Sequence, residues 1–188
     1  MNSRLSVATS LTALLLAFPA FAQAPQQLVA GKSQIRFAFQ QMGVSVEGRF
    51  RKFEASVLFD PRKPEETRAA FEVDLGSIDL GSVEGETEAR RKPWLHVEAF
   101  PRATFVAASV TAAGPGSFVA SGPLTIKGAT QPVTAPFTVT DSDGVRTVEG
   151  QFPLRRLQFR IGEGAWSDTD TVADQVTVRF RFVIPITP

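Results

Sequence analysis

Apolar and polar residues alternate along most of the chain from Gln34 onward. The clearest run is the last one, in which Val176, Val178, Phe180, Phe182 and Ile184 recur at every second position and Thr177, Arg179 and Arg181 separate the first four. Shorter runs of the same kind occur at residues 35–39, 57–59, 71–75, around 105, and at 124–126 and 133–139. Because residues two apart along a strand share one face of a sheet, this period predicts strands with one apolar and one polar face.

Turn-forming residues separate the predicted strands. Gly, Pro or Asp residues occur at 60–64, 114–116, 127–128, 141–144 and 162–164. Consecutive strands without helical crossovers predict an antiparallel sandwich or barrel, and the alternation is typical of both. Closure into a barrel of about eight strands removes exposed edges and leaves room inside for side chains or one small ligand, which favours the barrel.

One segment departs from the alternation. Residues 84–92 are polar and rich in helix-forming residues, and Pro93 follows them. We expect one short helix here, because proline does not continue a helix. Its charges are of both signs, which is typical of a solvated helix face rather than a binding patch.

The first residues have the pattern of an export signal. Arg4 provides a positive start, residues 11–18 are apolar, and Ala20 and Ala22 are the small residues of a cleavage site. We expect cleavage of residues 1–22, export to the periplasm, and one domain over residues 23–188. Removing 22 residues from 188 leaves 166, enough to bury a sizeable core.

Charge and cysteine content exclude several classes of function. One of the 20 basic residues, Arg4, lies in the predicted signal, so 19 basic residues face 19 acidic ones and the net charge is near zero. This balance gives no basis for binding nucleic acid. The chain has no cysteine, which excludes disulfides, thiolate metal sites and cysteine nucleophiles.

Few residues are suited to catalysis. His96 is the single histidine, and its place just after the predicted helix favours a structural role over that of a general base. One histidine without cysteine also excludes a zinc site. Residues 167–171 with Asp174 form an acidic cluster that lacks the glycine and terminal glutamate of a helical calcium loop, so we interpret its side chains as turn-forming. We predict no catalytic or metal-binding residues; an enzyme that uses Asp168 or His96 is the alternative.

The aromatic composition is unusual, with 16 Phe, 2 Trp and no Tyr. Save for the two indoles, these side chains have a large apolar surface and no polar group. Two interpretations fit. One is a solid, Phe-rich core, as in a structural or envelope-stress protein, and the other is a cavity lined with Phe.

Several segments together resemble the YceI-like family of secreted lipid-binding proteins. The resemblance extends from about Gly31 to Ile184, and it is carried by SQIRFAF at 33–39, QMGV at 41–44, EGRF at 47–50 followed by Phe53, FPRATF at 100–105, GPLTIKGATQPV at 122–133 and VADQV at 172–176. Lys32 and Gln41 stand where many family members have histidine. The resemblance implies an all-β fold, an extended antiparallel lipocalin-like barrel of about eight strands with one short helix.

The resemblance also implies an interior tunnel for a long apolar ligand, which is a polyisoprenoid, a prenyl quinone or a fatty-acyl chain. Burial of each methylene is favourable by about 0.8 kcal/mol, so roughly ten to twenty carbons bring about 8 to 16 kcal/mol before the cost of ordering the ligand. Such binding needs no cofactor and no catalytic group. We expect twelve residues to line the tunnel: Phe37, Phe39, Val44, Phe50, Phe53, Val73, Trp94, Phe105, Ile126, Phe137, Trp166 and Phe180.

The expected partners follow from this ligand. A quinone ligand would imply a membrane redox protein as partner. An open barrel mouth would expose apolar surface that a second subunit could cover, so a homodimer is compatible with the sequence. The residues leave the headgroup and the chain length of the ligand open.

Overall fold

The computed structural model describes residues 26–29 and 31–186. The predicted export signal, residues 1–22, lies outside the described residues. The strands are β1 (Gln34–Gln41), β2 (Val44–Phe50), β3 (Phe53–Leu58), β4 (Arg68–Asp74), β5 (Ile78–Asp79), β6 (Arg102–Val106), β7 (Ser109–Gly114), β8 (Ser117–Ile126), β9 (Ala129–Ser142), β10 (Val145–Arg155) and β11 (Val172–Pro185). The helices of this part of the chain are α1 (Val83–Arg90) and the short 3₁₀ helices η1 (Pro64–Glu66), η2 (Leu75–Ser77), η3 (Arg156–Phe159) and η4 (Gly164–Ser167).

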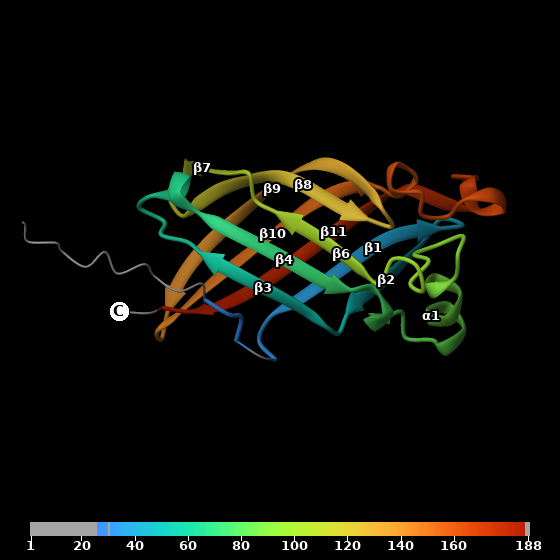
Figure 1. The fold of residues 1–188 in the computed structure, drawn as a ribbon, viewed down its shortest axis with the longest axis horizontal. Helices are drawn as coiled ribbons and strands as arrows, with labels where there is room; N and C mark the ends of the chain where they lie inside the picture. The colour runs from blue at the N-terminus through green and yellow to red at the C-terminus, as the bar shows by residue number, and fades with distance from the viewer. Residues whose placement is uncertain (1–25, 30, 187–188) are drawn as a thin grey trace, which may run out of the picture.

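The described strands form one antiparallel sheet that curls into a barrel (Figure 1). Hydrogen bonds join them in the order β3-β4-β6-β8-β9-β10-β11-β1-β2-β5, and β7 pairs with β8 beside β6. The two ends of this order meet because β2 and β3 are halves of one bent strand. At the bend, Arg51 N–H donates to Ser77 O and Asp74 N–H donates to Lys52 O, each at 3.1 Å.

Because β2 and β3 are halves of one bent strand, the number of strand positions around the interior agrees with the predicted barrel of about eight strands. The end of β2 pairs with β5, β3 pairs with β4, and β6 and β7 pair with successive parts of β8. If β2–β3, β4–β5 and β6–β7 are each counted once, about eight strand positions surround the interior. The predicted all-β antiparallel barrel with one short helix is confirmed.

Residues 26–29 fill the gap between β3 and the end of β11. Gln26 forms two backbone hydrogen bonds with Val57 in β3, at 2.8 and 3.2 Å, and Val29 N–H donates to Val183 O in β11 at 2.7 Å. The segment a few residues beyond the predicted cleavage site is therefore part of the barrel wall.

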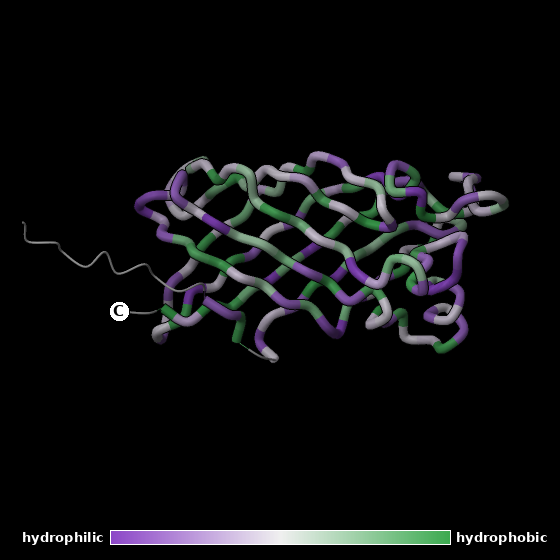
Figure 2. The backbone as a smooth tube through the Cα atoms, in the orientation of Figure 1, coloured by the Kyte–Doolittle hydropathy of each residue, from purple (hydrophilic) through white to green (hydrophobic). Residues whose placement is uncertain are grey.

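The alternation of the sequence is visible along the strands of the barrel (Figure 2). In β9, Val133, Ala135 and Phe137 are buried, whereas Thr134 and Pro136 between them are exposed. The inward-facing side chains form two buried clusters. One lies at the α1 end and includes Leu75, Ile78, Leu95, Ile126 and Phe159. The other includes Val57, Phe59, Val110, Phe118 and Ile184.

Helix α1 lies at one end of the barrel (Figure 1). Ser82 Oγ accepts a hydrogen bond from Gly85 N–H at 3.0 Å and caps the N-terminus of the helix. The helix ends at Arg90, two residues before the predicted end, because Lys92 precedes Pro93 and the α conformation is disfavoured before proline. In the part of the chain that the structure describes, no helix is long and apolar enough to cross a bilayer.

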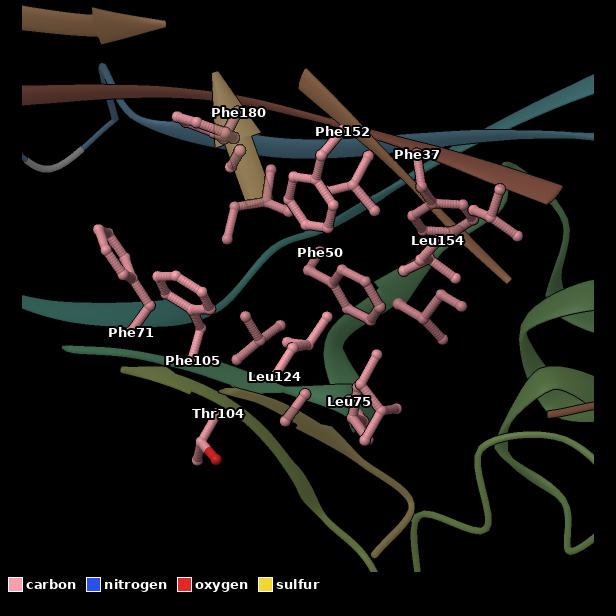
Figure 3. A pocket seen from close by; sticks show the side chains of 18 of the residues that line it. Phe37, Phe50, Phe71, Leu75, Thr104, Phe105, Leu124, Phe152, Leu154 and Phe180 are labelled. Atoms are coloured by element: carbon pink, nitrogen blue, oxygen red, sulfur yellow. The ribbon is translucent and has the colours of Figure 1, made fainter. Parts of the chain in front are cut away.

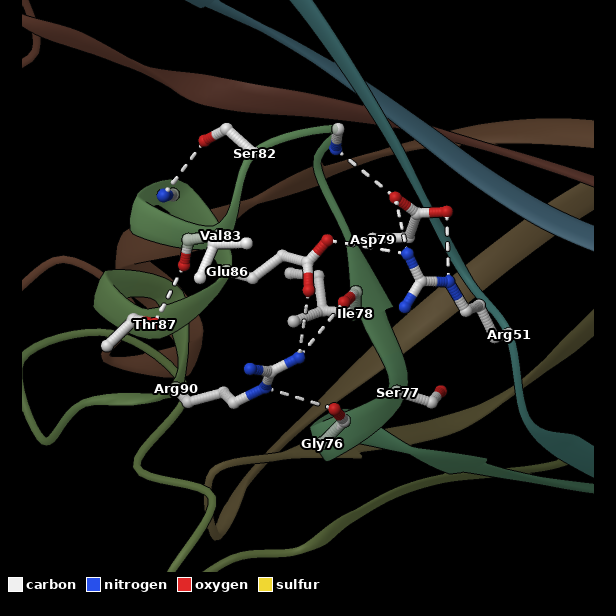
Figure 4. Close-up of polar contacts among 12 residues, drawn as sticks. Arg51, Gly76, Ser77, Ile78, Asp79, Ser82, Val83, Glu86, Thr87 and Arg90 are labelled. Carbon is white, nitrogen blue, oxygen red and sulfur yellow. Dashed lines mark hydrogen bonds and ion pairs between the residues drawn. The ribbon is translucent and has the colours of Figure 1, made fainter.

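Ion pairs and hydrogen bonds connect α1 with the neighbouring edge of the sheet at β5 and η2 (Figure 4). Arg51 pairs with Asp79 in β5 at 3.0 Å and with Glu86 in α1 at 3.5 Å. Arg90 pairs with Glu86 at 3.2 Å and donates from Nε to Gly76 O at 3.1 Å. These contacts hold the helix at the end of the barrel, where it borders the interior.

Candidate functional site

The barrel encloses a cavity of about 400 Å³ whose wall is almost entirely apolar (Figure 3). This volume lies in the range of about 300–1,000 Å³ that is typical of small-molecule sites. Within residues 26–29 and 31–186, ten phenylalanines line the cavity: Phe37, Phe39, Phe50, Phe59, Phe71, Phe105, Phe137, Phe152, Phe180 and Phe182. The structure therefore favours the Phe-lined cavity over the solid core.

The lining residues at the two ends of the cavity differ in exposure. At the end away from α1, called the buried end below, the lining includes the buried residues Val57, Phe59, Val110, Phe137 and Ile184. At the α1 end the lining includes Gln41, which is exposed, and Glu88, whose side chain is 35% exposed. The exposed part of the lining, at Gln41 and Glu88, is called the mouth below.

The register of β1 and β2 explains why their Phe side chains face inward. Ile35 in β1 lies opposite Phe50 in β2, and Phe37 lies opposite Gly48. Residues directly opposite each other in an antiparallel pair share one face of the sheet. A Cβ atom at Gly48 would come within 2.4 Å of the Phe37 ring, so the glycine provides the space that this ring occupies.

Most of the predicted lining residues face the cavity: Phe37, Phe39, Phe50, Val73, Trp94, Phe105, Ile126, Phe137, Trp166 and Phe180. Their role in binding a ligand stays a prediction.

For Val44 and Phe53 the predicted position is wrong. Val44 pairs with Gln41 beside the two-residue turn of Met42 and Gly43, at the tip of the hairpin, and is 66% exposed. The phenyl ring of Phe53 packs against that of Phe182, with 6.1 Å between centroids, and does not line the cavity.

Strand β10 and its lining residues Phe152 and Leu154 have a weak signature in the sequence. Gly150 and Pro153 interrupt the run, and both residue types are unfavourable inside strands. In the structure Gly150 lies opposite Phe180, whose ring a Cβ atom at Gly150 would meet at 2.5 Å. The spacing of Phe152 and Leu154 is the signal that indicates this strand.

Arg156 is a buried charge at the α1 end of the cavity. It is 2% exposed, and it lines the cavity. Its guanidinium lies over the ring of Trp94, at 5.7 Å from the centroid. Arginine has five N–H donors, and the side chain donates hydrogen bonds of 2.7–3.2 Å to the backbone carbonyls of Ala173, Ile161, Gly162, Trp166 and Val172. Burial lowers the pKa of Arg156.

Lys127 is a second buried charge, 3% exposed, at the same end of the barrel. Its Nζ donates to Arg160 O at 2.6 Å, to Pro93 O at 3.3 Å and to Glu163 Oε2 at 3.0 Å. The hydrogen bonds from Lys127 and Arg160 lower the pKa of the Glu163 carboxyl. Lys127 therefore joins the loop after α1 to the loop after β10.

His96 and Asp168 take part in local packing and turn contacts, and neither lines the cavity. The His96 ring packs edge-on against Phe100, with 5.6 Å between centroids. Asp168 accepts hydrogen bonds from Asp170 N–H at 2.9 Å and from Thr171 Oγ1 at 3.3 Å, which is the turn-forming role interpreted from the sequence. Among the described residues, no group of three His, Asp or Glu is placed to hold a metal ion.

The profile of the YceI-like domain matches residues 27–184. The chain belongs to this family. A protein of known structure, BcnA of Burkholderia cenocepacia, is 37% identical to this YceI-like chain and superposes with a TM-score of 0.81 over 83% of this chain and 98% of that one. A polyisoprenoid binding domain from Saccharophagus degradans is 15% identical, with a TM-score of 0.70 over 87% of this chain and 99% of that one. At this identity the likeness concerns the YceI-like fold alone.

Sequence relatives include two proteins named UPF0312. The one from Shewanella denitrificans is 32% identical over 103 residues, which are 54% of each chain. The one from Yersinia pestis is 35% identical over 101 residues, 53% of this chain and 52% of that one. This YceI-like chain thus spans about half the length of the curated relatives it matches.

Proposed function

We propose that this protein binds a long apolar ligand inside its barrel in the periplasm, and that it carries or sequesters this ligand without catalysing a reaction. The ligand is a polyisoprenoid, a prenyl quinone or a fatty-acyl chain. One observation carries the proposal, namely the cavity of about 400 Å³ with its almost entirely apolar wall. The Saccharophagus degradans neighbour, a polyisoprenoid binding domain with the same fold, supports the ligand class.

The shape and chemistry of the wall suit a chain-like ligand. The lining runs from Gln41 and Glu88 at the mouth, past Phe50 and Phe105, to Phe137 at the buried end. A hydrocarbon chain along this path replaces water contacts by contacts with Phe and aliphatic side chains, at about 0.8 kcal/mol for each buried methylene. Useful affinity therefore needs no strong polar anchor.

The polar groups near the cavity support binding rather than catalysis. Glu88 and Arg156 are the charged residues among the described lining positions. Arg156 has its donors engaged by backbone carbonyls. A general base paired with a nucleophile, which hydrolysis or group transfer requires, has no counterpart among the lining residues that the structure describes.

A blocked cavity tests the proposal. Ala120 in β8 lies opposite Ala135 in β9, and both line the cavity. Ala120→Phe places a phenyl ring in the space where the ligand chain would lie. Val119→Phe is the matched control, because successive side chains of a strand point to opposite faces and Val119 does not line the cavity.

The measurement is native mass spectrometry of protein expressed with its export signal and then offered prenyl alcohols, short-tailed prenyl quinones and fatty acids. We expect wild type and Val119→Phe to carry ligand, and Ala120→Phe to bind at least about tenfold more weakly, a loss of about 1.4 kcal/mol. Thermal unfolding reports that both variants are folded. Wild-type protein that carries none of these ligands would refute the proposed function.

A further inference from the structure

Three arginines lie in one row on the outer face of the barrel. Arg36 in β1 lies opposite Arg49 in β2 on one side and opposite Arg179 in β11 on the other. The neighbours of Arg36 in β1, Ile35 and Phe37, line the cavity, so the row points away from the cavity. Like charges directly opposite each other on a sheet are destabilising. The stability of the sheet therefore does not explain the row.

Carboxylates neutralise the row incompletely. Arg49 pairs with Asp79 at 2.7 Å. Arg179 lies 3.7 Å from Glu47, but both side chains are more than half exposed, so this pair contributes little. Arg36 is exposed and donates from Nε to an uncharged amide oxygen at 3.0 Å, and none of the described carboxylates forms an ion pair with it. A positive charge at Arg36 is thus open to an anion from outside.

A groove of about 630 Å³ lies along this part of the wall and is called the outer groove below. It crosses β8, β9, β10, β11 and β1, and its charged lining residues are Arg36, Arg179, Arg181 and Glu149. Arg181 and Glu149 form an ion pair at 2.9 Å. Three guanidinium groups against one carboxylate leave the outer groove with two excess positive charges, those of Arg36 and Arg179.

A break in strand pairing lies under the outer groove. Strand β10 pairs with β9 as far as Gly150, which lies opposite Phe137. Beyond this pair, β10 continues beside β11 and β9 continues beside β8, so the two strands separate. Pro136 and Gly150 line the outer groove at the point of separation. The hollow is therefore part of the backbone arrangement and does not depend on the rotamers of exposed side chains.

The polar lining of the outer groove suits a phosphate group. A guanidinium group donates two parallel hydrogen bonds to an oxyanion. Because Arg36 and Arg179 are opposite residues of neighbouring strands, one anion can contact both. The hydroxyl groups of Ser117 and Thr138 line the same groove and can donate further hydrogen bonds. A phosphate monoester, with a charge of about −2 and three free oxygens, matches both the excess charge and the number of donors.

We propose that the outer groove binds a phosphate group, carried by a soluble phosphate ester or by a lipid headgroup. The site is separate from the cavity, because Arg36 and Arg179 lie on the opposite face of the wall from the lining residues Phe37 and Val178. Binding here goes beyond the proposed function and does not depend on whether the cavity is filled.

Titration with inorganic phosphate, followed by NMR of the arginine Nε–H groups, tests the proposal. Arg36→Gln and Arg179→Gln each remove one guanidinium group from the outer groove. The matched control is Arg155→Gln, which removes the same charge from an arginine of β10 that is 72% exposed and does not line the groove. A parallel titration with chloride at equal ionic strength measures general screening.

We expect phosphate to shift the Nε–H signals of Arg36 and Arg179 first. Each single substitution in the outer groove should weaken phosphate binding by about three- to fivefold, and the double variant by at least about tenfold. Arg155→Gln should weaken it by less than about twofold. Equal shifts at all exposed arginines, or a double variant that binds phosphate as wild type does, would overturn the proposal.

Vesicles distinguish the two sources of the phosphate group. The probe is cosedimentation with phosphatidylcholine vesicles, with and without phosphatidic acid, whose headgroup is a phosphate monoester. Binding that requires phosphatidic acid and is lost in the double variant assigns the outer groove to a lipid phosphate. Binding of inorganic phosphate without vesicle binding assigns it to a soluble ester. If the protein binds neither probe, the proposal is wrong, while the proposed function of the cavity stands.

Discussion

Replacement of Arg156 by methionine should destabilise the fold strongly. Methionine keeps an apolar stem in the same space but removes all five N–H donors, so five backbone carbonyls lose their partner. Two of these, Gly162 O and Val172 O, take part in hydrogen bonds that are buried from water. The carbonyls of Ala173, Ile161 and Trp166 are partly buried, so water can replace the guanidinium there.

The magnitude follows from the two buried acceptors. Each buried polar group left without a partner costs about 1–3 kcal/mol, so we expect Arg156→Met to lower the free energy of unfolding by about 2–6 kcal/mol. Arg156→Lys should recover only part of the loss, because an ammonium group has three donors on a single atom and cannot reach carbonyls arranged around a planar guanidinium.

The assay is urea denaturation monitored by tryptophan fluorescence. Trp94 and Trp166 report on this region because their ring centroids lie 5.3 Å apart and the Arg156 guanidinium lies over the Trp94 ring. Arg155→Met is the control. The Arg155 side chain is 72% exposed and its Asp174 partner is 3.9 Å away, so its loss should cost less than about 1 kcal/mol. A loss for Arg156→Met no larger than that for Arg155→Met would refute the reasoning.

Two further predictions concern α1 and its anchor. Ser82→Ala removes the N-cap acceptor of Gly85 N–H and should lower the free energy of unfolding, measured by urea denaturation, by about 1 kcal/mol. Ser45→Ala, at an exposed position of β2, is the control and should have little effect. Equal effects of the two substitutions would contradict the capping role. Hydrogen bonds from Arg49 and Arg51 hold the pKa of the Asp79 carboxyl at about 2, below its ordinary value of 3.8. Because the unfolded chain binds this proton first as the pH falls, the stabilisation is complete above pH 3.8 and is lost between pH 3.8 and about 2. Asp79→Asn should therefore lower stability near neutral pH and flatten the fall in stability over that interval, and a slope equal to that of wild type would argue against it.

The period of the strands explains why so much of the cavity wall could be predicted. Phe37, Phe39 and Phe180 face inward because a strand turns successive side chains to opposite faces, and this depends only on local backbone geometry. The same argument fails for Val44. Phe50 in β2 lines the cavity, but Val44 in the same strand lies beside the two-residue turn and is 66% exposed, and the packing of the other strands decides how far along β2 the cavity extends.

Strand β10 shows the opposite kind of failure. Gly150 and Pro153 are locally unfavourable in a strand, yet the strand forms because it pairs with β11 along its length and with β9 as far as Gly150. Pro153 lies beyond the part that pairs with β9, where a missing N–H is tolerated. At Gly150 the missing side chain is required by the Phe180 ring, which lies close to its Cα. Tertiary packing thus explains Gly150, although glycine is locally unfavourable in a strand such as β10.

The all-β class, the positions of most strands, the one short helix and the inward direction of most Phe side chains depend on spacing along the chain, so they could be predicted from it. The bend between β2 and β3, the cavity that the Phe side chains leave and the position of its mouth at Gln41 and Glu88 became known only from the folded barrel. The same holds for Arg156, which is satisfied by five carbonyls. These features depend on contacts between residues far apart in the chain. The local spacing of apolar residues gives no information about such contacts.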